Sequence, residues 1–582
     1  MPASSQCLQC GTVVGVSDTF CGECGAQISL STSSQSPESA VTSCPTCGCS
    51  APADSAFCPE CGQAFMAAGP ASALGQAMDY SSVNFCLRLL VTGEQEIQSA
   101  YDDPEGGMSI SLLKSGRYEL GLILTDLSKL RERFGPDYPI FERTLNEYIA
   151  YKISDRCAYL MLDVSDNLIA KMQSPGWQQI VGLINNANGF LKEHLSRTPD
   201  TIFILGDNDV IPMGRFPNHI ITDPDREVET DLIYSTLSDS DPWQQAGTAL
   251  VPQLKVGRLP LGMGFGPDKF SHYLANIREK VSRPPEVSKV SGISAKVWEM
   301  ASQSMYSRLG GGLVKTSPEL GLENVLLEID VNAAIQFFNL HGTDTDAYWY
   351  GEENFQYPRT FGPETASQMR GINAIAVEAC YGAKFIGCNE SNSILLRALS
   401  HRTLGFLGSS KIAFGPAIPP NSLADVMAGE FLLAVQNGKD FGNATNIARK
   451  ATLNMSLLDG MTIKTLLSFN LFGDPTEKLL STGLSLGQIE FDELQVEIPD
   501  VLQEIRQSSM EANPELSEQV RSQLKVGIPE MDEVQPEITR IYLAGLKKEV
   551  NGLYYQSPSY PSRMAIVYAD DSGKVMGEFL SK

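Results

Sequence analysis

Eight of the thirteen cysteines in this 582-residue chain have the spacing of metal ligands. They form two sets, each with the pattern C-x2-C-x10-C-x2-C, and each cysteine of the first set recurs 37 residues later. The repeat indicates an internal duplication. In each set, two tight knuckles direct four thiolates at one ion, which is the tetrahedral coordination of structural zinc. The predicted ligands of two structural Zn²⁺ sites are Cys7, Cys10, Cys21 and Cys24, then Cys44, Cys47, Cys58 and Cys61.

Each predicted zinc ribbon is too short to bury a core of its own, so we expect its folding to depend on the metal. Four protein ligands leave no open coordination position for catalysis, which makes the role of the metal structural. The ribbons span residues 1–30 and 40–66, and the segment between them, SLSTSSQSPESAVTS, is typical of a flexible linker. Neither ribbon has the Lys and Arg content expected for nucleic acid, so a protein partner is the favoured interpretation.

The overall composition limits the other classes of function. A net charge of −25 argues against nucleic acid and anionic membranes as partners, because both bind basic surfaces. No stretch reaches the roughly 18 apolar residues of a membrane span, and MPASSQCLQCGTVV does not have the pattern of a signal peptide. Nine cysteines fall within the first 61 residues and the other four are scattered, which is typical of a reducing compartment with bound metal. We therefore expect a cytoplasmic protein.

From about residue 116 the sequence alternates between apolar runs and amphipathic stretches. YELGLILTDL, RCAYLMLDV and DTIFILGDNDVIP are predicted strands, and WQQIVGLINNANGFLKEHLSR has apolar residues at helical spacing. This alternation predicts an α/β fold with a mainly parallel sheet and helices on both faces. We expect a linker and lead-in over residues 67–115, α/β subdomains over 116–285 and 286–482, and a small α+β module over 483–582.

Two polar side chains stand at the ends of consecutive predicted strands. His341 follows the apolar run AAIQFFNL, and Cys380 follows INAIAVEA, 39 residues later. At the carboxyl ends of adjacent parallel strands, both side chains would emerge at the same edge of the sheet. An imidazole beside a thiol can make it nucleophilic, and the amides of Gly342 and Cys380 could stabilise an oxyanion. Either residue alone would be interpreted as a surface histidine or a core cysteine, but their joint position favours a catalytic pair.

The residues around this pair resemble the gingipain-like cysteine peptidases, members of the wider caspase-like group. The family signature is an apolar strand ending in His-Gly, then one ending in a small residue and Cys, here FFNLHG and AIAVEACYG. Further matches, in the family's order, are ILGDNDVIP, TDLIY with KVGRLP, LGFLGSS and NLFGDPTEKLL. The resemblance implies a caspase-like sandwich in which His341 is the general base, Cys380 the nucleophile and Gly342 an oxyanion donor. It implies architectural roles for Asp207, Asp231 and Asp474.

The resemblance therefore implies an enzyme, a cysteine endopeptidase that cleaves protein or peptide substrates through a thioester acyl-enzyme. Together with the zinc ribbons, it favours a regulated intracellular peptidase. Gingipains select a basic residue through an acid at the start of the helix before the His strand. In AKVWEMASQSMYSRLG the acid is Glu299, which makes Glu299 the candidate substrate-binding residue. The alternative is a catalytically silent caspase-like scaffold or adaptor that acts through its zinc ribbons.

Two further features leave alternatives open. The acidic clusters DNDV, DPDRE and SDSDPW could bind Ca²⁺ through carboxylate oxygens, but none has EF-hand spacing, and solvated loops are the preferred interpretation. The C-terminal module combines helical stretches with a hairpin that turns at DDSGK. It could cover the active site as a built-in inhibitor, serve as a docking domain, or be a packing appendage.

Overall fold

The computed structural model divides into two compact units, Met1–Met78 and Asp79–Lys582. In the first unit it describes two hairpins, β1 (Ser5–Gln6) with β2 (Val13–Val14) and β3 (Val41–Ser43) with β4 (Ser50–Pro52). The eight predicted zinc ligands lie outside the described residues. In the second unit the described residues are 113–114, 116–165, 176–220, 223–455, 459–480, 507–509, 513–524, 534–543, 545–546, 548–558 and 563–582.

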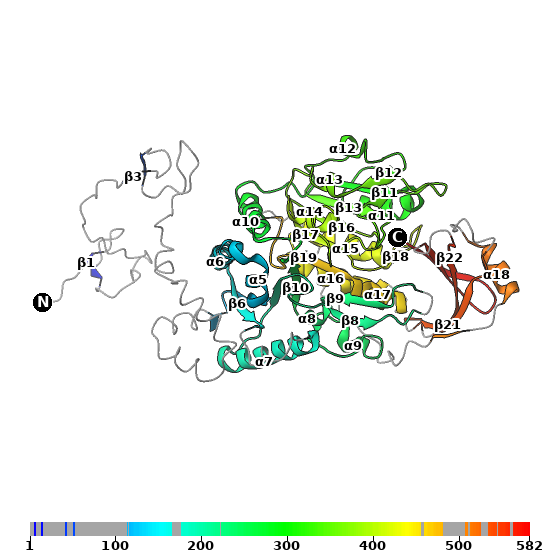
Figure 1. The fold of residues 1–582 in the computed structure, drawn as a ribbon, viewed down its shortest axis with the longest axis horizontal. Helices are drawn as coiled ribbons and strands as arrows, with labels where there is room; N and C mark the ends of the chain where they lie inside the picture. The colour runs from blue at the N-terminus through cyan, green and yellow to red at the C-terminus, as the bar shows by residue number, and fades with distance from the viewer. Residues whose placement is uncertain are drawn as a thin grey trace. The chain divides into compact units, whose positions relative to one another are not determined.

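The centre of the second unit is a ten-stranded sheet with the order β12-β11-β13-β16-β17-β19-β10-β7-β5-β6 (Figure 1). Neighbouring strands in this sheet are parallel except for the antiparallel pair β17 and β19. Both predicted subdomains contribute strands to it, since β19 lies beside β10. The strands are β5 (Glu119–Thr125), β6 (Cys157–Asp163), β7 (Thr201–Leu205), β10 (Lys255–Leu259), β11 (Val290–Ala295), β12 (Lys315–Ser317), β13 (Ile335–Asn339), β16 (Asn373–Val377), β17 (Thr403–Ser409) and β19 (Phe469–Gly473).

Helices alternate with these strands along the chain. The helices are α5 (Leu127–Phe134), α6 (Tyr138–Ser154), α7 (Trp177–Leu195), α8 (Leu232–Thr236), α9 (Ala246–Ala249), α10 (Pro267–Ser282), α11 (Glu299–Arg308), α12 (Val325–Glu328), α13 (Pro363–Ala366), α14 (Ile394–Leu399), α15 (Ala424–Gln436), α16 (Phe441–Met455), α17 (Gly460–Ser468) and α18 (Pro514–Arg521), with 3-10 turns η1 (Gly135–Asp137) and η3 (Lys296–Trp298). Two short hairpins pair β8 (Gly214–Pro217) with β9 (Glu227–Thr230) and β14 (Trp349–Tyr350) with β15 (Arg359–Phe361).

The apolar runs of the sequence form strands that are covered on both faces. Every residue of β7, β10, β13, β16, β17 and β19 is buried. A strand with one solvated face would alternate between buried and exposed residues, so continuous burial means that both faces of the sheet are packed. Among the helices, α6 packs with α10, and α15 packs with α16. The predicted α/β fold with a mainly parallel sheet is confirmed.

The C-terminal module contains an antiparallel sheet with the order β18-β24-β23-β22-β21-β20, as well as α18. Its strands are β18 (Phe414–Gly415), β20 (Gln507–Ser509), β21 (Glu537–Leu543), β22 (Lys548–Gln556), β23 (Met564–Ala569) and β24 (Val575–Ser581). One strand of this sheet, β18, is not part of the module. It lies between β17 and α15 in the sequence, so it belongs to the α/β body. The β18–β24 pair therefore joins the module to the body, and Figure 1 marks residue 582 beside β18.

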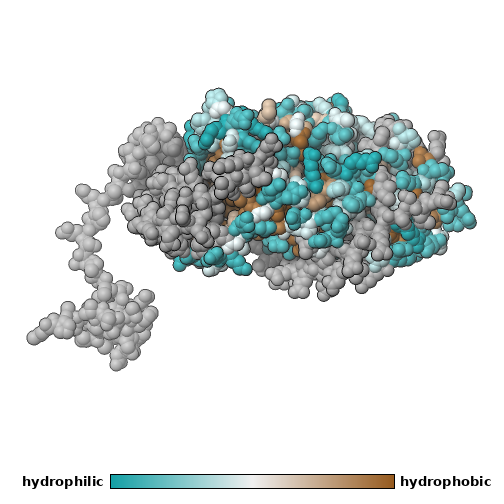
Figure 2. Space-filling model, turned by 60° about the horizontal axis from the view of Figure 1, so that its bottom comes forward, coloured by the Kyte–Doolittle hydropathy of each residue, from teal (hydrophilic) through white to brown (hydrophobic). Residues whose placement is uncertain are grey.

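The described surface in the view of Figure 2 is mostly hydrophilic, with scattered hydrophobic residues. This agrees with the acidic composition of the chain, whose net charge is −25. Among the described residues, no helix has an apolar stretch long enough to cross a membrane.

A buried ion pair joins two of the family-like motifs, TDLIY and KVGRLP. Arg258 in β10 places Nη2 and Nε 2.6 and 2.7 Å from the carboxylate of Asp231, the residue before α8. Its Nη1 donates to the carbonyl oxygens of Gly206 at 2.8 Å and Ile211 at 2.9 Å. Arg258 is fully buried and Asp231 is 3% exposed. The pair thus fixes the turn after β7 and the start of α8 on β10.

Replacing Asp231 by alanine would leave the Arg258 guanidinium buried without its counter-charge. We expect Asp231→Ala to lower the free energy of unfolding by about 3–5 kcal/mol, measured by urea denaturation. The control is Asp209→Ala, since the Asp209 side chain is 71% exposed. That variant is expected to stay within about 0.5 kcal/mol of the wild type. Equal losses in the two variants would contradict a stabilising role for the buried pair.

Candidate active site

The parallel register of β13 and β16 brings the predicted catalytic residues together. Phe338 lies opposite Val377 in this pair. His341 and Cys380 are each the third residue after these partners, so both lie at the same edge of the sheet and at the same level. Their backbones are in close contact, because a Cβ on Gly342 would overlap the carbonyl oxygen of Cys380. Only glycine permits this approach.

His341 is fixed by its main chain, a carboxylate and two rings. Its backbone exchanges two hydrogen bonds of 2.9 Å with Tyr350. Its Nε2 lies 2.7 Å from Oε2 of Glu352, and the rings of Trp298 and Tyr357 lie with their centroids 4.4 and 5.4 Å from that of the imidazole. Because a carboxylate accepts a hydrogen bond, the neutral imidazole carries its proton on Nε2. Nδ1 is then the ring nitrogen that can accept a proton.

The electrostatic surroundings keep His341 neutral and Glu352 charged. Burial lowers the pKa of His341; the hydrogen bond and charge of Glu352 oppose this shift, and the cations Arg563 and Lys582 add to it. Burial alone would raise the pKa of Glu352. However, its hydrogen bond with His341 and the guanidinium of Arg563, 2.6 Å from Oε1, lower that pKa to about 2. A neutral imidazole held by a carboxylate is the form that a general base requires.

The Cys380 thiol is covered in this structure. The residue is 1% exposed, and its Sγ lies 3.4 Å from the backbone nitrogen of Ala413 and 3.6 Å from the carbonyl oxygen of that residue. Its own backbone N–H donates to the carbonyl oxygen of Lys582 at 3.1 Å. Burial raises the pKa of the thiol to about 12, although the Ala413 N–H and the charge of Lys464 act in the opposite direction. The thiol is therefore protonated, and the expected oxyanion donor, the Cys380 N–H, is engaged by the main-chain oxygen of Lys582.

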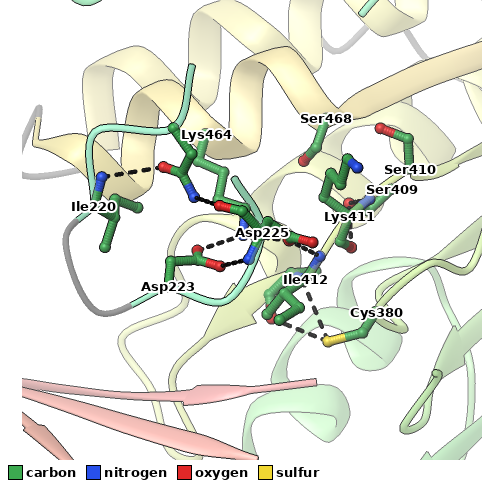
Figure 3. A network of polar contacts seen from close by, with 12 residues as sticks. Ile220, Asp223, Asp225, Cys380, Ser409, Ser410, Lys411, Ile412, Lys464 and Ser468 are labelled. Carbon is green, nitrogen blue, oxygen red and sulfur yellow. Dashed lines mark hydrogen bonds and ion pairs between the residues drawn. The ribbon is translucent and has the colours of Figure 1, made fainter. Parts of the chain in front are cut away.

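One buried carboxylate holds the chain on both sides of the thiol (Figure 3). Asp225 accepts hydrogen bonds from the Tyr381 hydroxyl at 2.5 Å, the Ile412 N–H at 2.9 Å and the Lys464 ammonium at 2.7 Å. Tyr381 directly follows Cys380, and Ile412 directly precedes the alanine that contacts Sγ. The Asp225 carboxylate therefore positions the thiol and the segment that borders it.

Local structure places the partners of this network. α17, which carries Lys464, begins with a capping box between Asp459 and Thr462, so its first turn is fixed. Asp223 accepts the backbone N–H of Asp225 at 3.0 Å and also binds Lys464. The oxygens of Asp223 and Asp225 in the DPDRE cluster are thus engaged by the Lys464 ammonium, by backbone N–H groups and by the Tyr381 hydroxyl. Among the described residues, no group of acids, histidines and cysteines could hold a metal ion, and the calcium prediction has no support.

A second buried cluster surrounds the Lys582 ammonium. Its Nζ lies 2.7 Å from Glu378, 2.6 Å from Asp425 in α15 and 3.2 Å from the side-chain oxygen of Asn339. The ring centroid of Trp298 is 4.9 Å away. Burial and the neighbouring Asp425 raise the pKa of Glu378 well above its usual value. Burial alone would lower the pKa of Lys582, but the two acids raise it, so the ammonium stays charged.

The predicted substrate-binding residue Glu299 directly follows Trp298, the residue whose ring lies beside His341. It begins α11 with a side chain that is 43% exposed, and its carboxylate is 2.9 Å from Lys296. The acids that contact Lys582 are Glu378 and Asp425, which the sequence interpretation missed. Both had a visible signal, since each is an acid within a largely apolar stretch, INAIAVEAC and ADVMAGEFLLAV. A carboxylate in such a stretch must find a partner when it is buried.

Comparisons with known proteins gave a family match in the N-terminal region and a set of similar solved structures. Residues 6–62 match the family model described as double zinc ribbon. Zinc binding by the N-terminal region, predicted from the cysteine spacing, is therefore confirmed at the level of the domain. No curated protein matches the sequence.

Solved structures, two of them of proteinases, show weak similarity to this chain. A structure described as a protease is 11% identical with a TM-score of 0.44, over 81% of this chain and 92% of that chain. The Arg-specific cysteine proteinase gingipain R is 11% identical with a TM-score of 0.44, over 79% and 97%. The Saccharomyces cerevisiae separase–securin complex is 10% identical with a TM-score of 0.30, over 68% and 26%.

Replacing Glu352 by glutamine tests the electrostatics around His341. The pKa of Glu352 is about 2 in the folded protein and 4.5 ordinarily. Its charge thus contributes stability that is fully present above about pH 5 and is lost as the pH falls through about 2. We expect Glu352→Gln to lower the free energy of unfolding by about 3 kcal/mol at pH 7, with a difference that shrinks toward pH 2.

Urea denaturation of both proteins at several pH values between 7 and 2 measures this difference. The matched control is Glu353→Gln, since Glu353 is the exposed neighbour of Glu352. This control should follow the wild type at every pH. A loss in Glu352→Gln that does not change with pH would show that the carboxylate charge is not its cause.

Proposed function

We propose that the chain is a cysteine endopeptidase in which Cys380 is the nucleophile and His341 is the general base. The observation that carries this proposal is a peptide segment lying across the thiol. Lys582 accepts the Cys380 N–H at 3.1 Å and donates its own N–H to the Ala413 carbonyl oxygen at 2.9 Å. A substrate held in the same way would present its scissile carbonyl carbon to Sγ and its carbonyl oxygen to the Cys380 amide.

The proposed reaction uses the two side chains in two half-reactions. Nδ1 of His341 accepts the thiol proton while Sγ bonds to the carbonyl carbon, and the amides of Cys380 and Gly342 stabilise the oxyanion. The imidazolium then donates this proton to the leaving nitrogen, the C–N bond breaks, and a thioester remains on Cys380. Next, His341 removes a proton from water, and the water oxygen attacks the thioester carbon. Collapse of that intermediate breaks the C–S bond, and the thiolate takes the proton back from His341.

Glu352 and a small cavity support the two halves of this reaction. Glu352 orients the imidazole through Nε2 and stabilises the imidazolium that forms in each half. A cavity of about 20 Å³ is bordered by Cys380, Tyr381 and Thr343. One water molecule requires roughly 10–15 Å³, so the cavity has room for the water that hydrolyses the thioester.

The remaining features support an intracellular, regulated peptidase. The cysteine usage favours a reducing compartment, and two structural zinc ions in the ribbons fit the two four-thiolate sets. The ribbons are candidates for contact with a protein partner, and the substrates are proteins or peptides. The acidic charge supports neither nucleic acid nor an anionic membrane as a partner.

Removing either member of the dyad should abolish cleavage. We expect Cys380→Ala and His341→Ala to lower kcat/KM for peptide hydrolysis by about a thousandfold or more. The measurement is the hydrolysis of a peptide library by the full chain and by its Lys582→Ala variant, in which the thiol is expected to be open. The control is Cys388→Ser, which changes another thiol of the same region. Cleavage that survives Cys380→Ala, or that is absent from both starting proteins, would favour the scaffold alternative.

The zinc stoichiometry can be measured directly. We expect two zinc ions per chain, and one in the double variant Cys7→Ser/Cys10→Ser or in Cys44→Ser/Cys47→Ser, because each change removes one knuckle of one site. Mass spectrometry of metals in the purified chain gives the count. One zinc per wild-type chain would show that the eight cysteines do not form two separate sites.

A further inference from the structure

We propose that the segment 575–582 is an intramolecular ligand of the candidate active site. In this proposal β24 occupies the groove for the substrate backbone, and Lys582 fills a pocket that selects a primary ammonium. The proposal rests on the proposed function, since it names the substrate class and the regulation of the same site. It also chooses the built-in inhibitor among the roles that the sequence left open for the C-terminal module.

The backbone of the segment is bound as a peptide substrate would be. β24 pairs antiparallel with β18, with Ser581 opposite Phe414 and Leu580 opposite Gly415. Lys582 continues this pattern, because its N–H donates a hydrogen bond to the carbonyl oxygen of Ala413, the residue before β18. Its carbonyl oxygen then reaches the Cys380 amide. An extended segment that adds to a strand edge gains affinity from main-chain hydrogen bonds, whereas side-chain pockets give specificity.

The pocket matches the number of donors on an ammonium. The Lys582 Nζ has three N–H donors, and the pocket offers three acceptors, on Glu378, Asp425 and Asn339, at 2.7, 2.6 and 3.2 Å. All three acceptor residues and Lys582 are at most 1% exposed. A guanidinium is planar, larger than an ammonium, and spreads its five N–H donors over three nitrogens, so it does not match acceptors that surround one nitrogen. The pocket therefore selects lysine over arginine.

One wall of the pocket consists of glycine. A Cβ on Gly415 would overlap Cε of Lys582, and it would lie 2.9 Å from Nζ and 3.1 Å from the Asp425 carboxylate. Gly415 is thus the position where the strand that binds the segment also leaves room for its lysine. β18 therefore takes part both in binding the backbone of segment 575–582 and in selecting the side chain of Lys582.

The C-terminal module also contacts Glu352, the hydrogen-bond partner of His341. Arg563, which directly precedes β23, lies 2.6 Å from Glu352, the carboxylate that holds His341. Its guanidinium also lies 5.3 Å from the ring centroid of Tyr357, which packs on His341. The module therefore contacts the main chain of Cys380 through Lys582 and the carboxylate that holds His341 through Arg563. Activity would require that the segment leaves the groove.

Thiol reactivity in the full chain tests the proposal. We expect Cys380 to react slowly with iodoacetamide in the wild type, and about tenfold or more faster in Lys582→Ala, because the segment is held less often over the thiol. Peptide mass spectrometry resolves Cys380 from the other thiols. The matched control is Lys574→Ala, since Lys574 is exposed on the same hairpin, and this variant should behave as the wild type. Equal rates in wild type and Lys582→Ala would overturn the proposal.

Peptides added to the Lys582→Ala variant test whether the pocket selects an ammonium. The probes are acetylated amides of the segment Glu-Phe-Leu-Ser-Lys and its versions ending in arginine or norleucine. We expect the lysine peptide to protect Cys380 from alkylation at about tenfold lower concentration than the other two. Equal protection by the arginine peptide would overturn the selection of an ammonium.

A second variant keeps the test valid if Lys582→Ala is destabilised by its unpaired carboxylates. Gly415→Ala retains Lys582 but fills its space, so Cys380 should again react faster, and the lysine peptide should no longer protect it. The control is Gly312→Ala, where a Cβ would meet no atom within 4 Å. Circular dichroism verifies that each variant is folded. Slow, wild-type reactivity in a folded Gly415→Ala would contradict the proposal.

The two proposals fail in different ways. If opening and protection occur as expected but no peptide is hydrolysed, the ligand role of segment 575–582 stands and the peptidase function fails. If the wild type and Lys582→Ala hydrolyse peptides equally fast, the peptidase function stands and the ligand role fails.

Discussion

The close contact between Gly342 and the backbone of Cys380 is the constraint on which the candidate site depends. It exists because β13 and β16 are parallel neighbours in matched register, so that the turns after both strands leave the sheet at one level. A shift by one residue would reverse the direction of every side chain on the strand, and the buried apolar residues of both strands prevent such a shift. The register of the core thus sets how far apart His341 and Cys380 lie. Packing energy, rather than a local feature of the loops, positions the chemistry.

Buried charges add a second level of organisation around this core. Asp225 is paired with Lys464 within the body, whereas Glu352 is paired with Arg563 of the module, and Lys582 is the cation beside Asp425 and Glu378. A buried carboxylate without a cation is costly, so the body and the module stabilise one another through these pairs. A lysine substrate would supply the cation that Lys582 provides here. The pocket can therefore hold either the ammonium of Lys582 or that of a substrate. The acidic pocket without an ammonium is less stable than either filled pocket.

The sequence predicted those features that local patterns encode. Apolar runs predicted the parallel sheet, their polar ends predicted His341 and Cys380, and cysteine spacing predicted the zinc ribbons. Contacts between distant segments have no such pattern. Nothing near Glu352 or Arg563 marks them as partners, because their pairing depends on how a loop after β13 meets the module. Glu299 was predicted from the order of elements in the gingipain-like family. Glu378, in contrast, lies beside Lys582 because it directly follows β16.

The architecture of the module permits release without unfolding. β24 lies between β18 and β23, and its longer ladder is with β23, where Leu580 pairs with Ala565 and Phe579 with Ile566. Separation from β18 breaks a two-residue ladder and the ion contacts of Lys582, while the module keeps its own sheet. Because both ligand and groove belong to one chain, their effective concentration is high, and weak contacts suffice to keep the groove filled. In the proposed release, the β18–β24 ladder of two residues is short enough for a competing peptide or a movement of the module to displace β24, once the contacts of Lys582 and Arg563 are also broken.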